Sequence, residues 1–168
     1  MKLTEKQFLS KLEEHKGILL KVSRIYFDDS EDQKDLVQEI ILQLWKSHES
    51  FKGNSQFSTW VYQVAINTAL LFFKKYKRKP KQIPIAKHDL QAESVYDHKY
   101  EKQLDQFYQA AQQLSKIEKA LIFLYLEGQT GEQVAQTLGM SASNARVKLN
   151  RTKNKLKGLL KVNANEIR

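Results

Sequence analysis

The sequence predicts an all-α protein of two small helical domains joined by a flexible linker, the C-terminal domain being a helix-turn-helix. Three observations lead to this prediction. Apolar residues recur at helical spacing through most of the chain, without a convincing strand pattern. Both prolines, Pro80 and Pro84, fall in one mostly polar segment. A short helix, a glycine turn and a cation-rich helix follow in residues 130–157. The predicted division is a domain at 1–79, a linker at 80–105 and a domain at 106–168.

The charge balance favours a polyanionic partner. The 168 residues include 28 Lys and Arg against 19 Asp and Glu, a net charge of +9. The excess is localised, because residues 141–168 hold eight Lys or Arg and a single acid. Such a segment is typical of nucleic-acid binding. There is no cysteine for disulfides or thiolate metal sites, and no apolar run long enough to span a bilayer. We therefore expect a cytoplasmic protein with no cofactor and no membrane insertion.

The N-terminal half predicts three helices. Apolar residues from Phe8 to Tyr26 mark the first, which Gly17 is expected to interrupt. The polar stretch DDSED precedes the second helix, and Ser58 is expected to cap the third. The inward residues of the second helix are expected to be Leu36, Val37, Ile40, Ile41 and Leu44. Those of the third are expected to be Val61, Val64, Ala65, Thr68 and Phe72.

The C-terminal half carries clear signals for helix ends. The segment SKIEKALIFLYLEG is a helix that Gly128 is expected to close in the left-handed conformation. Thr130 and Gln133 have the spacing of a capping box for the next helix, which should end at Gly139. Ser141 then opens the final helix, and the spacing of these elements predicts a helix-turn-helix.

The final helix has the pattern of a recognition helix in a DNA major groove. Its inward face is expected to comprise Ala145, Leu149, Thr152, Leu156 and Leu159. Asn and Ser side chains can bond base edges, a valine can meet a thymine methyl, and flanking cations reach phosphates. The candidate DNA-contacting residues are Ser143, Asn144, Arg146, Val147, Lys148, Asn150, Arg151 and Lys153. The alternative is a purely structural role, in which a cationic surface helix packs in a helical hairpin.

The second predicted helix has an outer face of its own. Leu42 falls on this face among Asp35, Gln38 and Glu39. An exposed leucine surrounded by polar and acidic residues suits docking to a basic protein partner.

Three motifs in order resemble a bacterial sigma factor. They are DLVQEIILQLW, SFKGNSQFSTWVYQVAINTALLFFKK and LSKIEKALIFLYLEGQTGEQVAQTLGMSASNARVKLNRTKNKLK. The resemblance as a whole covers nearly all of residues 8–157. More narrowly, the chain resembles the extracytoplasmic-function (ECF) subfamily of the sigma-70 family. The resemblance implies a non-enzymatic promoter-specificity subunit, with sigma region 2 in residues 1–79 and region 4 in 106–168. Its implied partners are core RNA polymerase and promoter DNA, both duplex and melted non-template strand. An anti-sigma factor is a further candidate.

The resemblance also implies roles for individual residues. The helix containing DLVQE matches the polymerase-binding segment of the family, and the implied contacts are Asp35, Leu36, Gln38, Glu39 and Leu42. The FKGNSQFSTWVYQVAINTA stretch matches the part that opens the minus-ten element, where aromatic rings suit base stacking. The implied minus-ten residues are Phe51, Lys52, Gly53, Asn54, Ser55, Phe57, Trp60, Tyr62, Asn67, Lys74 and Lys75. Core packing explains Phe57 and Trp60 equally well. The helix-turn-helix matches the part that binds the minus-thirty-five element.

Some positions depart from the family pattern. Ile66 stands where arginine is common, and Phe72 and Phe73 stand where a polar residue is common, so the usual duplex contacts are not expected there. Four acids of the predicted linker either mimic nucleic acid in the polymerase cleft or belong to a simple spacer. They are Asp89, Glu93, Asp97 and Glu101.

Two other functions compete with this interpretation. A stand-alone helix-turn-helix regulator would need a dimer interface and a palindromic site. A metal-dependent nuclease would need convergent carboxylates, whereas the available acids lie in one short stretch without a second group to meet them. These acids are Asp28, Asp29, Glu31, Asp32 and Asp35.

Overall fold

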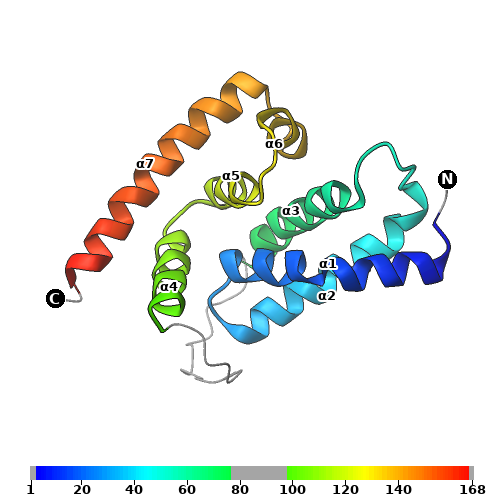
Figure 1. Cartoon of the computed structure of the whole chain (residues 1–168), viewed down its shortest axis with the longest axis horizontal. Coiled ribbons are helices and arrows are strands. Elements are labelled where there is room, and N and C mark those ends of the chain that lie inside the picture. The colour runs from blue at the N-terminus through cyan, green and yellow to red at the C-terminus, as the bar shows by residue number, and fades with distance from the viewer. Residues whose placement is uncertain (1–2, 77–97, 167–168) are drawn as a thin grey trace.

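The structure is a computed structural model that describes residues 3–76 and 98–166, and every regular element within these ranges is helical (Figure 1). The N-terminal domain consists of α1 (Glu5–Tyr26), α2 (Ser30–Ser47), the short 3-10 helix η1 (His48–Ser50) and α3 (Phe57–Tyr76). The C-terminal domain consists of α4 (His98–Gln112), α5 (Lys116–Leu126), α6 (Gly131–Leu138) and α7 (Ala142–Glu166). The predicted all-α fold with two helical domains is confirmed. Pro80, Pro84, Asp89, Glu93 and Asp97 lie outside the described residues.

Helix α1 is continuous, so the expected break at Gly17 is wrong. It begins with a capping box between Thr4 and Gln7. Apolar side chains on both sides of Gly17, among them Leu12 and Leu19, are buried against α2 and α3. A glycine inside a helix costs about 1 kcal/mol relative to alanine. Burial of the flanking apolar residues outweighs that cost.

Helix α2 buries a narrower stripe than the sequence suggested. Asp29 caps it by accepting hydrogen bonds from the amides of Glu31 and Asp32. Leu36, Ile40 and Leu44 are buried in the core, as predicted. Val37 is half-buried, but Ile41 is 42% exposed and its expected inward position is wrong. The core of this three-helix domain reaches only one side of α2.

Helix α3 begins at Phe57, so Ser58 lies inside the helix and is not its cap. The amide of Trp60 already bonds the carbonyl of Gln56 at 3.3 Å. Burial of the Phe57 ring in the core accounts for the earlier start. The predicted inward residues Val61, Ala65 and Thr68 are buried, and Val64 and Phe72 are half-buried.

Helix α4 starts at His98, inside the range 80–105 that was assigned to the linker. Residues 98–105, including Glu101, are therefore helical, and the linker is shorter than expected. The helix contacts α7 and α1. It buries Ala110 and Ala111 completely, whereas its first turns are exposed. The apolar residues Tyr100, Leu104, Phe107 and Ala111 recur at helical spacing. The polar first turns directly follow the proline-containing segment, however, and are therefore included in the predicted linker.

The helix ends of the C-terminal domain follow the predicted signals. Gly128 and Gly139 have φ angles of +77° and +65°, in the left-handed region that favours glycine. Thr130 and Gln133 form the expected capping box at the start of α6. The Ser141 hydroxyl accepts a 3.2 Å bond from the amide of Asn144 at the start of α7.

The inward face of α7 is also confirmed. Ala145, Thr152 and Leu156 are buried, and Leu149 and Leu159 are half-buried against the core. In the view of Figure 1, α5 lies between α3 and α7, and it contacts both. Among the helices described, none has the length and apolar character that a membrane crossing needs.

Candidate docking and DNA-binding surfaces

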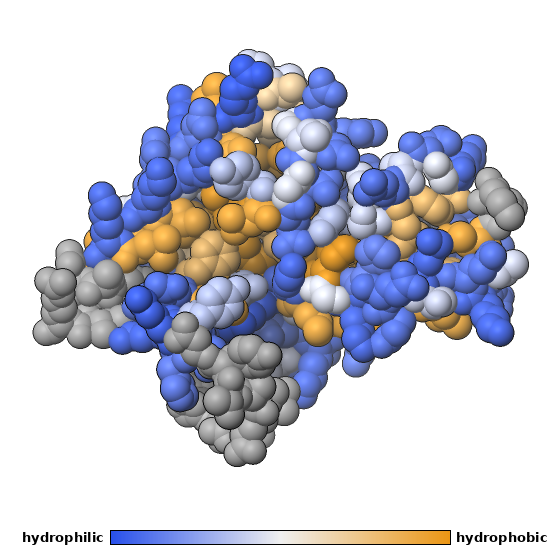
Figure 2. Space-filling model, viewed as in Figure 1, coloured by the Kyte–Doolittle hydropathy of each residue, from blue (hydrophilic) through white to orange (hydrophobic). Residues whose placement is uncertain are grey.

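Helix α7 presents a hydrophilic outer face. Seven of the eight predicted DNA-contacting residues are exposed: Ser143, Asn144, Arg146, Val147, Lys148, Asn150 and Arg151. In Figure 2 the outer edge formed by α7 is lined with hydrophilic side chains, whereas apolar side chains gather between α7 and α4. The helix is therefore held by its apolar side and offers hydroxyl, amide and cationic groups to solvent. That combination is what base-edge and phosphate contacts require.

Lys153 has a different environment from its neighbours. It is half-buried, and its ammonium lies 4.5 Å from the ring centroid of Tyr125 at the end of α5. A cation over an aromatic face is attracted by about 0.5–1 kcal/mol at an exposed site. Lys153 therefore helps to hold α7 against α5. It also adds positive charge at the edge of the exposed face of α7.

The outer face of α2 combines acidic and apolar groups. Asp35 and Gln38 are exposed, Glu39 is half-buried, and Leu42 is 43% exposed. Leu36, which belonged to the same predicted docking set, is 0% exposed and packs in the core. The resemblance-based assignment of Leu36 is therefore corrected, because a side chain with no accessible surface cannot contact a partner. We call the remaining four residues the α2 docking face.

The α2–α3 loop separates into a polar tip and an aromatic base. Lys52, Gly53, Asn54 and Ser55 at the tip are exposed, and Gly53 has a φ of +76°, as a sharp loop requires. The base is a cluster of rings from the loop and from α3, with centroids 5.3–5.5 Å apart between Phe51, Phe57 and Trp60. Phe8 of α1 adds edge contacts to this cluster.

Burial decides the role of these rings. Phe51 and Phe57 are buried and Trp60 is half-buried. For Phe51 and Phe57 the structure therefore supports core packing, and their assignment as base-stacking residues is corrected. They hold the loop, while the exposed polar tip is free to meet a ligand.

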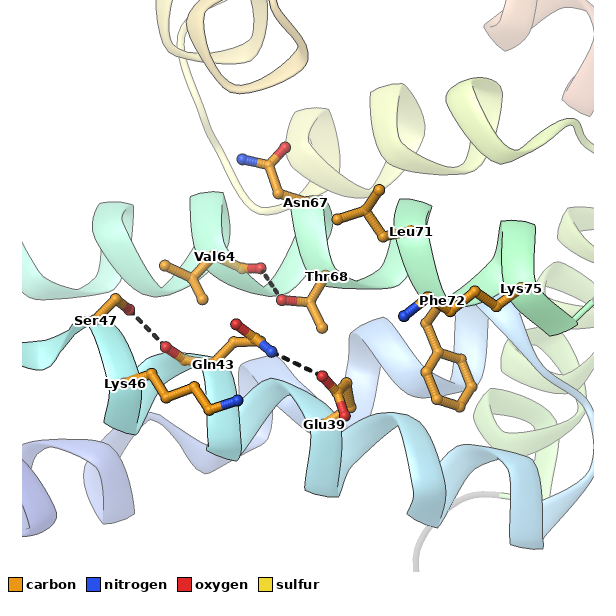
Figure 3. Close-up of a pocket in the computed structure, with 10 residues that line it drawn as sticks. All are labelled: Glu39, Gln43, Lys46, Ser47, Val64, Asn67, Thr68, Leu71, Phe72 and Lys75. Carbon is orange, nitrogen blue, oxygen red and sulfur yellow. Dashed lines mark hydrogen bonds between the residues drawn. The ribbon is translucent and has the colours of Figure 1, made fainter.

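A groove joins the α2 docking face to the outer side of α3 (Figure 3). It has a volume of about 590 Å³ and is lined by Glu39, Gln43, Lys46, Ser47, Val64, Asn67, Thr68, Leu71, Phe72 and Lys75. Gln43 donates a 2.8 Å bond to the Glu39 carboxylate along α2. Asn67 projects from α3 on the side away from α2, and it is exposed. The predicted minus-ten residues Lys74 and Lys75 are exposed at the end of the same helix.

Tyr62 is not on an open surface. Its ring is 9% exposed, and its hydroxyl donates a 2.8 Å bond to Oε2 of Glu127 in the C-terminal domain. Burial, followed by the bond to Glu127 and the charge of that carboxylate, raises the pKa of Tyr62 well above its ordinary value. In this arrangement Tyr62 is therefore not accessible for the predicted contact with a melted strand.

Sequence reasoning missed Glu127 altogether. The residue contacts Tyr62 across 65 positions and Lys21 across 106 positions. No local pattern identifies such partners, because the contact exists only after the two domains pack together.

The acidic stretch before α2 has structural roles. Asp29 caps the helix, and Glu31 pairs with Lys34 at 2.9 Å. Within the residues that the structure describes, no group of three or more His, Asp or Glu side chains could hold a metal ion.

Comparison with protein families gives two matches. Residues 12–79 match the model described as Sigma-70 region 2, and residues 104–156 match the model described as Sigma-70, region 4. The ECF RNA polymerase sigma-E factor of Haemophilus influenzae is 37% identical over 67 residues, which are 40% of this chain and 35% of that protein. The sigma-E factor of Escherichia coli is 39% identical over 51 residues, 30% of this chain and 27% of that protein. The chain thus aligns with only about a third or less of these relatives.

Solved structures share the fold over nearly the whole chain. RpoE in complex with the anti-sigma factor NepR, from Bartonella quintana, has a TM-score of 0.73 and 23% identity, covering 94% of this chain and 98% of that one. CnrH in complex with the cytosolic domain of CnrY has a TM-score of 0.67 and 16% identity, covering 95% of this chain and 90% of that one.

Proposed function

The chain belongs to the sigma-70 family, in its extracytoplasmic-function group, and we propose that it is a promoter-specificity subunit of bacterial RNA polymerase. It binds the core enzyme, recognises the minus-thirty-five element and opens the minus-ten element. The observation that carries this proposal is that one chain presents two separate surfaces of opposite character. An acidic and apolar face lies on α2, and a cationic, amide-bearing face lies on α7.

The α2 docking face supports binding to the polymerase. Asp35, Gln38 and Glu39 supply negative and polar groups, and Leu42 supplies an apolar anchor among them. A partner with a basic rim and a small apolar socket fits such a surface. We assign that partner as core RNA polymerase.

The α7 surface supports binding to the minus-thirty-five duplex. Asn150 and Ser143 bond base edges, Val147 meets a thymine methyl, and Arg146, Lys148 and Arg151 reach phosphates. All six side chains are exposed on a helix whose opposite side is anchored to α5 and α6. The rigid support fixes the direction in which these groups point.

The loop tip and the outer side of α3 support a contact with the minus-ten element. Lys52, Asn54 and Ser55 surround a sharp turn at Gly53, and Asn67 lies on the adjoining helix. Polar groups arranged around an open loop can bond an unpaired base or its phosphate. Binding energy from the polymerase, the duplex and the melted strand drives strand separation without ATP.

An anti-sigma protein is a further proposed partner. One solved structure that shares this fold is a sigma factor in complex with an anti-sigma factor. A protein of that class would compete with the polymerase for the same surfaces.

Promoter binding with and without polymerase tests the proposal. We expect sequence-specific binding of promoter fragments only when core polymerase is present, with permanganate-reactive thymines in the minus-ten region of the complex. The alternative function, a stand-alone helix-turn-helix regulator, gives the opposite result. It would bind a palindromic duplex tightly without polymerase, and gel filtration would give the mass of a dimer.

A further inference from the structure

Helix α3 has one exposed stripe between Val61 and Lys75, a segment that the structure describes in full. The exposed residues of this segment are Asn67, Leu71, Lys74 and Lys75. They follow one another at three or four positions from Asn67 through Leu71 to the two lysines, so they share one side of the helix. The other side chains of the segment are buried or half-buried, because α3 contacts α1, α2, α5 and α6. We call the four exposed residues the α3 stripe.

Leu71 is the apolar member of the α3 stripe. It is 65% exposed, and it projects from the same side of α3 as Asn67 (Figure 3). Single exposed leucines are common on protein surfaces and need no special explanation. Leu71 differs from such a residue because an amide lies one turn before it and two ammonium groups lie one turn after it. Amide, apolar and cationic groups together are the set that contacts base edges and phosphates in DNA.

The two aromatic residues that follow Leu71 are engaged in packing. The Phe72 ring lies 5.8 Å from that of Phe27, and the Phe73 ring lies 5.8 Å from that of Tyr26. Both Phe72 and Phe73 are half-buried. They therefore anchor α3 to the C-terminal end of α1. Leu71 is the large apolar side chain that this part of α3 presents to a ligand.

The position of Leu71 along α3 indicates which part of a promoter it can meet. At 1.5 Å per residue, Leu71 lies about 20 Å along the helix from its start at Phe57, next to the loop that we propose for an unpaired base. This distance spans several base pairs at about 3.4 Å each. The far end of α3 leads toward the C-terminal domain, whose proposed target lies upstream. Leu71 is therefore placed upstream of the opened bases, where the strands remain paired.

We propose that Leu71 is a specificity-determining residue that packs against the C5 methyl group of one thymine in the paired upstream edge of the minus-ten element. This inference rests on the proposed function and adds one base contact to it. In a paired duplex the thymine methyl lies in the major groove, which admits a helix. Cytosine presents an amino group there and no methyl. Leu71 would remove water from that amino group without replacing its hydrogen bond, so cytosine is disfavoured.

Replacement of thymine by uracil tests this contact, because uracil forms the same base pair and lacks only the methyl group. The probe is a promoter fragment selected by run-off transcription, in which each thymine at and beside the minus-ten element is replaced singly on either strand. Affinity is measured for the full-length protein bound to core polymerase. Loss of one buried methyl should weaken binding about three- to fivefold at one position. That thymine should be unreactive to permanganate in the wild-type complex, as a paired base is.

The test variant is Leu71→Gln, which removes the apolar contact and keeps a good helix former. It should bind the thymine and uracil fragments equally, with the affinity that the wild type has for the uracil fragment. Leu71→Met keeps an apolar side chain and should keep the sensitivity to uracil. Leu20→Gln is the matched control, because Leu20 is 57% exposed on α1, and it should respond to uracil as the wild type does. Circular dichroism verifies that each variant is folded.

Three results would overturn the contact. The first is a wild-type complex that binds every uracil fragment as tightly as its thymine counterpart. The second is a uracil effect that persists undiminished in Leu71→Gln, and the third is a sensitive thymine that reacts with permanganate. In each of these cases the promoter is still bound, so the proposed function stands. If run-off transcription selects no promoter fragment at all, the proposed function fails and the contact of Leu71 fails with it.

Discussion

Lys155 of α7 and Glu118 of α5 form a 2.9 Å ion pair that ties the recognition helix to the helix beneath it. The same carboxylate accepts a 2.7 Å bond from the amide of Ser115, and the Ser115 hydroxyl accepts a bond from the amide of Glu118. One acid therefore completes the cap of α5 and orients α7. The stability of the domain and the orientation of its proposed DNA-binding face therefore depend on the same residue.

The first prediction concerns pH. Burial acts to raise the pKa of Glu118, but its bonds with Lys155 and Ser115 outweigh burial and hold the pKa below the ordinary value of 4.5. A lowered carboxyl pKa adds stability that is complete above the ordinary pKa and is lost as pH falls through the folded pKa. The difference in urea stability between wild type and Glu118→Gln should stay constant from about pH 6 to 8 and shrink below pH 4.5. Glu14→Gln, at an exposed position, is the control. A difference in urea stability that stays the same below pH 4.5 would contradict the prediction.

The second prediction concerns helix capping. Thr130→Ala removes the hydroxyl that accepts a bond from the amide of Gln133 at the start of α6. Loss of such a cap costs about 1 kcal/mol of the free energy of unfolding. Thr130→Ser keeps the hydroxyl, and its free energy of unfolding should therefore remain close to that of the wild type. Urea denaturation measures both variants, and equal losses would show that the cap is not the cause.

The third prediction separates phosphate contacts from base contacts on α7. Arg146→Ala should weaken binding of the polymerase complex to promoter DNA for all sequences and reduce the salt-dependence slope by about one unit. Asn150→Ala should change base preference in the minus-thirty-five region while leaving that slope unchanged. Titrations at several salt concentrations measure both effects. An unaltered slope for Arg146→Ala would place this side chain away from DNA.

The fourth prediction compares two leucines of α2. Leu42→Ala should reduce co-elution with core polymerase without changing the free energy of unfolding by more than about 0.5 kcal/mol, since the residue is exposed. Leu36→Ala should instead lower that free energy by about 2–5 kcal/mol, because it empties a core position. Asp35→Arg with Glu39→Arg should abolish co-elution in a folded protein. Unchanged co-elution of the double variant would refute the α2 docking face.

Local signals in the sequence predicted much of the C-terminal domain. Capping boxes, left-handed glycines and the inward face from Ala145 to Leu156 all depend on residues within a few positions of each other. The chain between such signals was harder to interpret. Helix α4 has apolar residues at helical spacing, but its polar first turns follow the proline-containing segment and fall in the predicted linker. The break expected at Gly17 does not occur, because the apolar residues on both sides of it are buried.

The candidate sites were predicted in part. The exposed positions of Asp35, Asn67 and Arg146 agree with the sequence, whereas Leu36 and Tyr62 are buried. Leu36 could have been recognised from its place in the apolar stripe of α2. The burial of Tyr62 could not have been recognised from the sequence, because the surface that covers this residue comes from the other domain. Ile66, which departs from the family pattern, is buried as well, on the side of α3 that this domain covers.

Run-off transcription tests the central claim most directly. Purified core bacterial RNA polymerase would be incubated with this protein and a library of promoter fragments, with each protein alone as a control. The proposed function predicts transcripts from a specific subset of fragments only when both proteins are present. Absence of such transcripts, combined with sequence-specific duplex binding by the protein alone, would contradict it and identify a stand-alone regulator instead.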